Sequence, residues 1–185
     1  IQIKLSSFNY LSSEKILYYI YAVLHSNEYR RRFEDFLKID FPRIPFTQNE
    51  GLFIRLTEIG EELVEHHLMR KSVFNSNLFK IREDKQDESR LVSKVTFLED
   101  GNIMINSKIY FEGIPKEVNN LCIGSYKVCH KWLTGLKGNY LNHDKIKEFS
   151  NIIYALNKTL DLMKEIDYLI DEHGGWQIAF NASLG

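Results

Sequence analysis

The sequence has 185 residues, which is enough for one domain or two small ones. Hydrophobic residues make up 44% of the chain and charged residues 26%, so the chain can bury a core. Its net charge of −1 differs from the strongly basic charge that is common in nucleic-acid-binding domains. It has no signal peptide and no apolar run of membrane-spanning length, so we expect a cytoplasmic protein without a membrane partner.

Cys122 and Cys129 are the only cysteines, and their spacing is not that of a zinc-ligand pair. We expect both to be buried thiols in a reducing compartment. The chain starts at Ile1 rather than at methionine, which suggests a fragment of a longer protein.

Two helices are predicted near the N-terminus. Ser12 or Ser13 can cap the first and Ser26 can cap the second. Tyrosines crowd the first helix, which indicates packing against the core or a neighbouring domain. Arginines 30–32 on the second helix have acidic neighbours, so a solvated, internally paired face is expected rather than a phosphate patch. The apolar positions that define the helices are Ile16, Leu17, Ile20, Val23 and Leu24, then Tyr29, Phe33, Phe36 and Leu37.

The segment around Arg43 is predicted to be extended. Pro42 and Pro45 fix their own φ angles and restrict the residues before them. Arg43 is therefore held in a fixed direction, where it can contact a phosphate or pair with a carboxylate.

A long amphipathic helix is predicted next, ending near Leu68. Thr47 and Glu50 form a Thr-x-x-Glu capping box at its start. His66 and His67 are adjacent and point to different faces, which argues against a shared metal ion.

A small antiparallel sheet is predicted in the middle of the chain. Residues 81–90 are almost continuously charged and favour a mobile loop. Residues 91–97 alternate as a strand, Asp100-Gly101 predicts a two-residue hairpin turn, and residues 102–106 form the partner strand. The further strand candidates are 109–111 and 120–123.

The longest predicted helix runs from His143 to about Glu172 and can be capped by Asn142. Its heptad-like apolar stripe is interrupted by Asp167, and residues 176–185 are expected to be a tail. The predicted fold class is therefore α+β: a helical N-terminal part, a small antiparallel β-sheet in the middle, and a long C-terminal helix packed against both.

The stretch 123–133 carries the main functional signal. A short apolar run ends at Gly124, and a hydroxyl, a phenol and a lysine precede a predicted helix. A rigid turn that directs polar and basic groups outward suits a polyanion or a base edge, and a strand-to-helix junction with solvated lysines is the alternative. Residues 126–147 hold five lysines and one acid, whereas residues 153–172 hold two lysines and five acids, so the positive surface is local.

Motifs for catalysis are missing from the sequence. It has neither a Gly-rich loop followed by Lys-Ser or Lys-Thr nor a Gly-x-Ser-x-Gly elbow. Glu83-Asp84-Lys85 matches one end of a nuclease-like pattern but lacks apolar strand flanks. We predict that this chain is not an enzyme and binds no cofactor or metal.

Three segments resemble blocks of one known family. They are IYAVLHS at 20–26 with Tyr29-Arg30 and DFPRIP at 40–45; IGSYKV at 123–128 with KWL at 131–133 and KG at 137–138; and the helix 160–167. In this order they are similar to the C-terminal specificity domain of Type ISP restriction-modification enzymes, and the resemblance covers nearly the whole chain.

The resemblance implies a target-recognition domain from a large bacterial enzyme. Such enzymes join a nuclease, an ATP-driven translocase and an adenine-specific methyltransferase to this domain. S-adenosylmethionine, ATP and Mg are the cofactors expected of the full-length parent. The methyltransferase motif Asn-Pro-Pro-Tyr is absent here, so catalysis is expected upstream of Ile1.

From the residues and the resemblance together, we expect sequence-specific recognition of double-stranded DNA. The phosphate-binding candidates are Lys127, Lys131, Lys137, Lys145 and Arg43. The base-contacting candidates, which have suitable donors and acceptors, are Ser125, Tyr126, Asn102 and Asn106.

We expect residues 1–70 to form a helical part that docks to an upstream methyltransferase domain of the same polypeptide. Residues 71–185 are expected to form the DNA target-recognition part. Each lysine can serve solubility alone, and Asn102 and Asn106 can be turn residues only. The alternative function is a helical protein–protein docking module without DNA contact.

Overall fold

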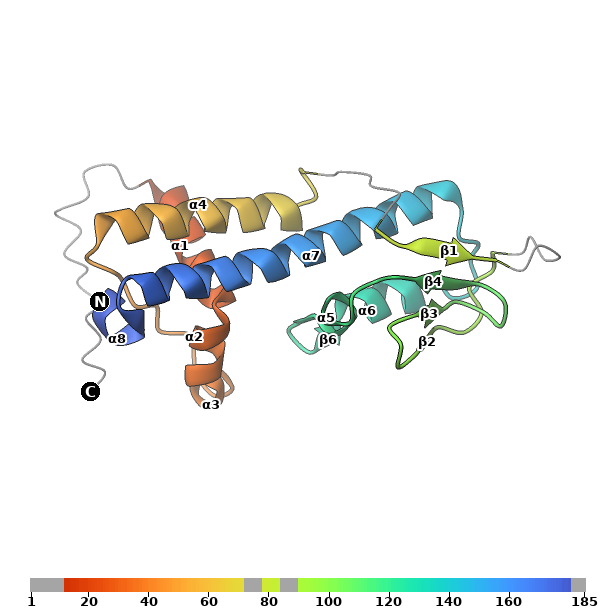
Figure 1. Cartoon of the computed structure of the whole chain (residues 1–185), viewed down its shortest axis with the longest axis horizontal. Coiled ribbons are helices and arrows are strands. Elements are labelled where there is room, and N and C mark those ends of the chain that lie inside the picture. Colours follow the sequence, from red (N-terminus) through yellow and green to blue (C-terminus); the bar gives the residue numbers. More distant parts are fainter. Residues whose placement is uncertain (1–11, 72–77, 84–89, 181–185) are drawn as a thin grey trace. The chain divides into compact units, whose positions relative to one another are not determined.

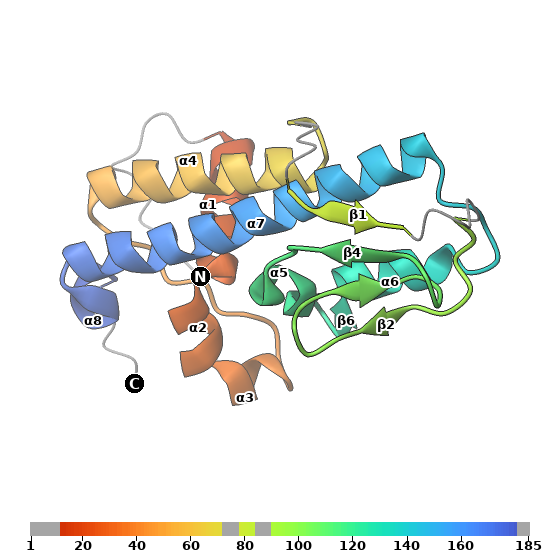
Figure 2. The same ribbon diagram turned by 45° about the vertical axis from the view of Figure 1, so that its right-hand side comes forward.

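The computed structural model describes residues 12–71, 78–83 and 90–180 and divides into two compact units (Figures 1 and 2). The first unit combines Ile1–Leu68 with Asp161–Gly185, and the second is Met69–Leu160. The predicted loop 81–90 and the predicted tail 176–185 therefore lie partly outside the described residues. One helix, α7, contributes its first part to the second unit and its last part to the first.

The first unit is helical. The Ser12 hydroxyl caps α1 by accepting a hydrogen bond from Lys15 N at 3.3 Å, and the Ser26 hydroxyl caps α2 by accepting from Tyr29 N at 3.0 Å, so both caps are confirmed. The second predicted helix is broken at Phe33 into α2 and α3. The helices of this unit, besides the end of α7, are α1 Ser13–His25, α2 Asn27–Arg32, α3 Glu34–Leu37, α4 Glu50–His67 and α8 Gly175–Ala179.

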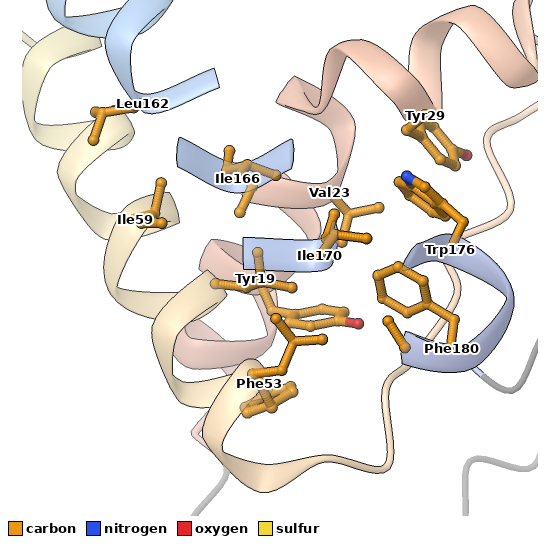
Figure 3. Close-up of a cluster of buried hydrophobic side chains, with 14 of the residues drawn as sticks. Tyr19, Val23, Tyr29, Phe53, Ile59, Leu162, Ile166, Ile170, Trp176 and Phe180 are labelled. Carbon is orange, nitrogen blue, oxygen red and sulfur yellow. The ribbon is translucent and has the colours of Figure 1, made fainter. Parts of the chain in front are cut away.

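Aromatic and aliphatic side chains together form the core of the first unit (Figure 3). The buried Tyr19 ring is stacked between Phe46 and Phe53, at centroid distances of 5.0 and 4.7 Å. Trp176 and Phe180 pack against each other at 4.6 Å and are both buried. The expectation that residues 176–185 form a tail is therefore wrong for residues 176–180, because the apolar face of α8 completes this core.

Helices α1 and α4 approach each other closely at Gly60. A Cβ atom at Gly60 would lie 1.8 Å from the carbonyl oxygen of Tyr18. Only glycine allows the two backbones this separation. The glycine thus sets the distance between the two helices.

The capping box predicted at Thr47 is not formed. The α4 cap is Asn49, whose side chain accepts a hydrogen bond from Leu52 N at 2.9 Å. The Thr47 hydroxyl instead donates to the Ala179 carbonyl at 2.6 Å and accepts from Asn49 N at 3.1 Å. A contact distant in sequence replaces the local cap.

Helix α7, His143–Glu172, matches the predicted bounds and has the Asn142 side chain accepting from Lys145 N at 2.9 Å. Asp167, which interrupts the apolar stripe, has a structural role. Its carboxylate accepts from the Ser26 hydroxyl at 2.5 Å and from the backbone N–H groups of Asn27 and Glu28 at 3.1 and 3.3 Å. A carboxylate on α7 therefore stabilises the first turn of α2.

The second unit contains an antiparallel sheet with strand order β1-β4-β3-β2. Its registers pair Ile81 with Phe111 and Phe97 with Ile103. Strand β1 overlaps the start of the loop expected at residues 81–90, so that expectation is wrong for residues 81 and 82. The strands are β1 Lys80–Arg82, β2 Thr96–Phe97, β3 Ile103–Met104 and β4 Tyr110–Glu112.

The hairpin between β2 and β3 has a longer loop than predicted. Leu98 N donates to Asn102 O at 2.9 Å, and Gly101 N donates to Leu98 O at 3.1 Å. The Leu98–Asn102 pair therefore closes a three-residue loop, 99–101, in which Gly101 takes the left-handed conformation with φ of +93°. This is the arrangement of a type I turn followed by a glycine bulge.

The core of the second unit lies between the sheet, α6 (Val128–Gly135) and the first part of α7. Phe111 and Phe149 are fully buried with ring centroids 5.0 Å apart, and Trp132 is stacked on Phe149 at 5.1 Å. Leu133 on α6 is also fully buried.

The predicted α+β class is confirmed, with helices at the start, an antiparallel sheet in the middle and a long helix near the end. Helix α7 supplies Phe149 and Ile153 to the core of the second unit and Ile166 and Ile170 to that of the first. No described helix has both the length and the apolar character needed to cross a membrane.

Candidate nucleic-acid interface

The stretch 122–127 forms a separate two-stranded hairpin. Strand β5, Cys122–Ile123, pairs with β6, Tyr126–Lys127, in the register Cys122↔Lys127 and Ile123↔Tyr126. The two-residue connection is Gly124-Ser125, and Gly124 has φ of +60°. Glycine at the first position is typical of type II′ hairpin turns, which require a positive φ there.

Buried side chains hold the base of this hairpin. It lies between α5, Lys116–Asn120, and α6. Val118 on α5 and Cys129 on α6 are both fully buried in the core of the second unit. Val128 N donates to Leu121 O at 3.3 Å, which ties the two strands' outer ends together. The turn therefore projects from an anchored base.

The tip of the hairpin is more exposed than the sequence indicated. Ile123 is 56% exposed and Tyr126 is 58% exposed. The apolar run before Gly124 is thus not a buried base, and only Leu121 of that run is half-buried. Cys122 is also exposed, so the expectation of two buried cysteines is wrong for this residue and confirmed for Cys129.

Two lysines lie beside the turn, and neither pairs with a carboxylate among the described residues. The Lys131 ammonium lies over the Tyr126 ring, 4.2 Å from its centroid, which is a cation–π contact. The Lys127 ammonium donates to the Asn120 amide oxygen at 2.8 Å. Both side chains are exposed; Lys127 ends β6, and Lys131 lies in the first turn of α6. Residues 118–143 contain no Asp or Glu, so all the formal charges in this stretch are positive.

The other two predicted lysines are placed differently. Lys137 is exposed just beyond the end of α6, and the axial rise of a helix puts it about 15 Å along the chain from Lys127. Lys145, in the first turns of α7, pairs with Glu148 at 2.7 Å. This hydrogen bond lowers the pKa of Glu148, which also accepts from the Trp132 indole N–H at 3.1 Å.

Asn102 and Asn106 use their side chains in their own turns. The Asn102 amide donates to the Asp100 carboxylate at 2.8 Å. The Asn106 amide oxygen accepts from the backbone N–H groups of Lys108 and Ile109 at 2.9 and 2.8 Å. The Asn106 amide nitrogen donates to Leu91 O at 3.1 Å.

Arg43 belongs to the first unit. Its guanidinium lies over the Phe36 ring at 5.0 Å, and its carbonyl accepts from the Tyr29 hydroxyl at 2.9 Å. The predicted fixed direction is thus explained by a ring below the side chain and a hydrogen bond to the backbone. Within the described residues no carboxylate pairs with it.

A model of the Type ISP C-terminal specificity domain matches residues 4–165. The chain belongs to this family. The resemblance inferred from the three sequence blocks is therefore confirmed, and the β5–β6 hairpin and its lysines lie within the matched residues.

Three solved structures share the fold of this specificity domain at low sequence identity. A nuclease-deletion mutant of the Type ISP restriction-modification enzyme LlaGI, in complex with a DNA substrate mimic, is 22% identical with a TM-score of 0.63, covering 84% of this chain and 14% of that one. The ATP-dependent Type ISP restriction-modification enzyme LlaBIII bound to DNA is 20% identical, with a TM-score of 0.66, and the match covers 88% of this chain and 12% of that one. A DrdV–DNA complex is 20% identical, with a TM-score of 0.64, and the match covers 84% of this chain and 18% of that one.

The specificity domain thus spans less than a fifth of each of these chains. A search of curated proteins found no match.

Groups suited to metal binding do not gather in the described part of the specificity domain. His66 is buried and lies 3.5 Å from Glu62, whereas His67 accepts or donates a hydrogen bond with the Tyr21 hydroxyl at 2.7 Å. The adjacent histidines therefore have different neighbours. Glu83 pairs with Arg90 at 2.7 Å, and the rest of the Glu83-Asp84-Lys85 pattern lies outside the described residues.

Sequence reasoning missed the exposed Ile123 and the hairpin itself. The available signal was Gly124-Ser125 between two residues of high strand propensity, because a Gly-first dipeptide in that setting indicates a two-residue hairpin. The burial of Cys129 could be expected, and it raises the pKa of that thiol to about 12, which keeps it protonated and unreactive.

Proposed function

We propose that this chain recognises a specific sequence in double-stranded DNA for a restriction-modification enzyme that methylates adenine. The observation that carries the proposal is the β5–β6 hairpin. An anchored base and an exposed two-residue turn are combined with two lysines that pair with no carboxylate in the part of the chain that the structure describes. A two-stranded ribbon fits the major groove of DNA, where each base pair presents a distinct pattern of groups.

In this proposal Lys127 and Lys131 bind phosphates and fix the register of the hairpin on the duplex, because backbone contacts position a protein without recognising sequence. Ser125 and Tyr126 then lie at the tip, where a hydroxyl and a phenol can donate to or accept from base edges. Lys137 would extend the phosphate contacts along α6.

The remaining candidates would contribute less. Lys145 would have to leave Glu148 to reach a phosphate. Asn102 and Asn106 already hydrogen-bond within their turns, so they would support the second unit more than they contact bases. Arg43 would contact DNA from the first unit.

The parent enzyme would supply the chemistry. We propose that residues 71–185 carry target recognition and that an upstream methyltransferase extrudes the recognised adenine to reach its amine. S-adenosylmethionine, ATP and Mg would bind to those upstream parts and to a translocase and nuclease. The residues of this chain do not fit these groups, since it has no phosphate-binding loop and no Asn-Pro-Pro-Tyr motif.

One observation favours a second role, protein docking, for residues 1–70. Ile39 and Phe41, which follow α3, are 84% and 86% exposed. Such a pair of large apolar side chains suits a contact with the methyltransferase domain of the same polypeptide. This role can accompany DNA recognition, or replace it in the alternative of a docking module without DNA contact.

The test is charge reversal at the hairpin, read out as DNA affinity across a salt series. Selection from a random duplex pool gives the ligand, and fluorescence anisotropy gives its dissociation constant. Each phosphate contact adds about 0.9 to the slope of log affinity against log salt. Lys127→Glu with Lys131→Glu should therefore reduce the slope by about 2 and weaken binding at least about tenfold.

The matched control is Lys164→Glu with Lys94→Glu, two exposed lysines outside the acid-free stretch 118–143. This pair changes the net charge equally and should leave most of the affinity in place. Equal losses in both double variants would contradict a hairpin site, and the absence of binding at low salt would favour the docking module.

A further inference from the structure

The two exposed apolar side chains at the hairpin tip form one surface. Ile123 and Tyr126 are directly opposite each other in the antiparallel register, next to the turn. Residues opposite each other in such a pair project from the same face, with Cβ atoms about 5 Å apart. More than half of each side chain is accessible to solvent. The tip therefore presents an apolar patch beside the Ser125 hydroxyl.

This patch contrasts with its immediate surroundings. Val118, Cys129 and Leu133, which hold the base of the hairpin, are all fully buried. The chain thus buries these three side chains while leaving two apolar ones exposed at the turn. Single exposed apolar residues are ordinary, but an opposed pair at a projecting turn suits a contact with an apolar group of a ligand.

The charge around the patch selects the kind of ligand. Lys131 lies beside it, Lys127 follows Tyr126 at the end of β6, and no Asp or Glu occurs in residues 118–143. The Lys131 ammonium covers one face of the Tyr126 ring at 4.2 Å, which restrains the ring and keeps a positive charge beside it. A polyanion that also presents a small apolar group is complementary to both features. Duplex DNA meets this description in the major groove, where the 5-methyl group of thymine is the apolar group.

We propose that Ile123, beside the ring of Tyr126, contacts the 5-methyl group of a thymine in the recognised sequence. The proposal rests on the proposed function of the hairpin as a DNA-recognition element. It assigns to the tip a specificity that hydrogen bonds from Ser125 alone do not give, because a hydroxyl both donates and accepts and can therefore contact any base edge. It also makes at least one A·T pair a part of the recognised sequence.

The test replaces thymine by deoxyuridine, one position at a time, in the duplex selected by the full chain. This change removes a methyl group and leaves every hydrogen-bonding group in place. Burial of one methyl-sized group corresponds to roughly fourfold in affinity. We expect one or two positions to bind about fourfold more weakly as uracil, while the other positions are unaffected.

The protein arm uses Ile123→Ala, with Ile178→Ala, another exposed isoleucine, as the matched control. Ile123→Ala should bind the thymine and uracil duplexes equally, and Ile178→Ala should keep the fourfold preference. This non-additivity identifies a direct contact, since a general loss of affinity would leave the preference unchanged. Ile123 is exposed, so the variant should fold normally.

The outcomes separate the two proposals. Specific binding without any uracil effect, or with an effect that survives in Ile123→Ala, overturns the methyl contact and leaves DNA recognition intact. A selected sequence without an A·T pair overturns it as well. The absence of sequence-specific binding overturns the proposed function and the methyl contact together.

Discussion

The strongest structural prediction concerns Asp167, the carboxylate of α7 that holds the first turn of α2. It accepts from the Ser26 hydroxyl at 2.5 Å, from the Asn27 amide at 3.0 Å, and from two backbone N–H groups at 3.1 and 3.3 Å. Loss of a helix cap costs about 1 kcal/mol, and a hydrogen bond to a charged group contributes roughly 1.5 to 3 kcal/mol. Water can replace part of this set, because Asp167 is half-buried. We expect Asp167→Ala to lower the free energy of unfolding by about 3 kcal/mol.

The assay is urea unfolding followed by the fluorescence of Trp176, which lies in the core of the first unit. A Trp132→Phe background leaves Trp176 as the single tryptophan, since the chain has two. The expected loss corresponds to a decrease in melting temperature of roughly 6 to 12 °C for a chain of this size. Asp161→Ala, which removes an exposed carboxylate from the same helix, should change stability by less than about 0.5 kcal/mol. Equal effects of the two variants would refute the capping role.

Three further predictions follow from single groups. Burial and the nearby charge of Arg30 lower the pKa of His25 from 6.5 to about 4, so His25 is protonated in the unfolded chain at a higher pH than in the folded chain. As the pH falls from about 6.5 to about 4, the free energy of unfolding should therefore decrease by at most about 3 kcal/mol. His25→Gln should flatten that decrease in a pH series of urea titrations. Gly60→Ala should destabilise the first unit by several kcal/mol, roughly as for overpacked cores, whereas Gly135→Ala, which has open space around it, should be neutral or slightly stabilising in thermal melts. A thiol reagent should label the exposed Cys122 quickly and the buried Cys129 only when the chain unfolds, and rapid labelling of both thiols would contradict the burial of Cys129. If the hairpin is the DNA interface, specific duplex DNA should protect Cys122 from the reagent.

The parts of the fold that sequence reasoning predicted depend on local interactions. The caps at Ser12, Ser26 and Asn142 are hydrogen bonds to backbone N–H groups three residues away, so neighbouring residues determine them. The bounds of α7 follow from its apolar stripe in the same way. Thr47 has the same local pattern, but its hydroxyl is bonded to Ala179 instead.

The parts that were missed depend on tertiary contacts. Strand β1 has a charged sequence, and it forms because its backbone pairs with β4 while Arg82 pairs with Glu112 at 2.7 Å across the two strands. In the candidate site, the lysines and the turn could be located from the sequence, whereas the exposure of Ile123 could not. An apolar residue in a short run is buried or exposed according to what packs on it, and local sequence does not contain that information.

The division of the chain has a consequence for its synthesis. The first unit depends on pairs such as Ser26–Asp167 and Thr47–Ala179, whose members are 141 and 132 residues apart. A growing chain folds as its segments emerge, N-terminal parts first. Helices α1 and α4 are therefore made early but must wait for Trp176 and Phe180 before their apolar faces are covered. The second unit is continuous in sequence and needs no such delay, so a chain whose synthesis stops late would carry a formed β5–β6 hairpin attached to an incomplete, aggregation-prone helical unit.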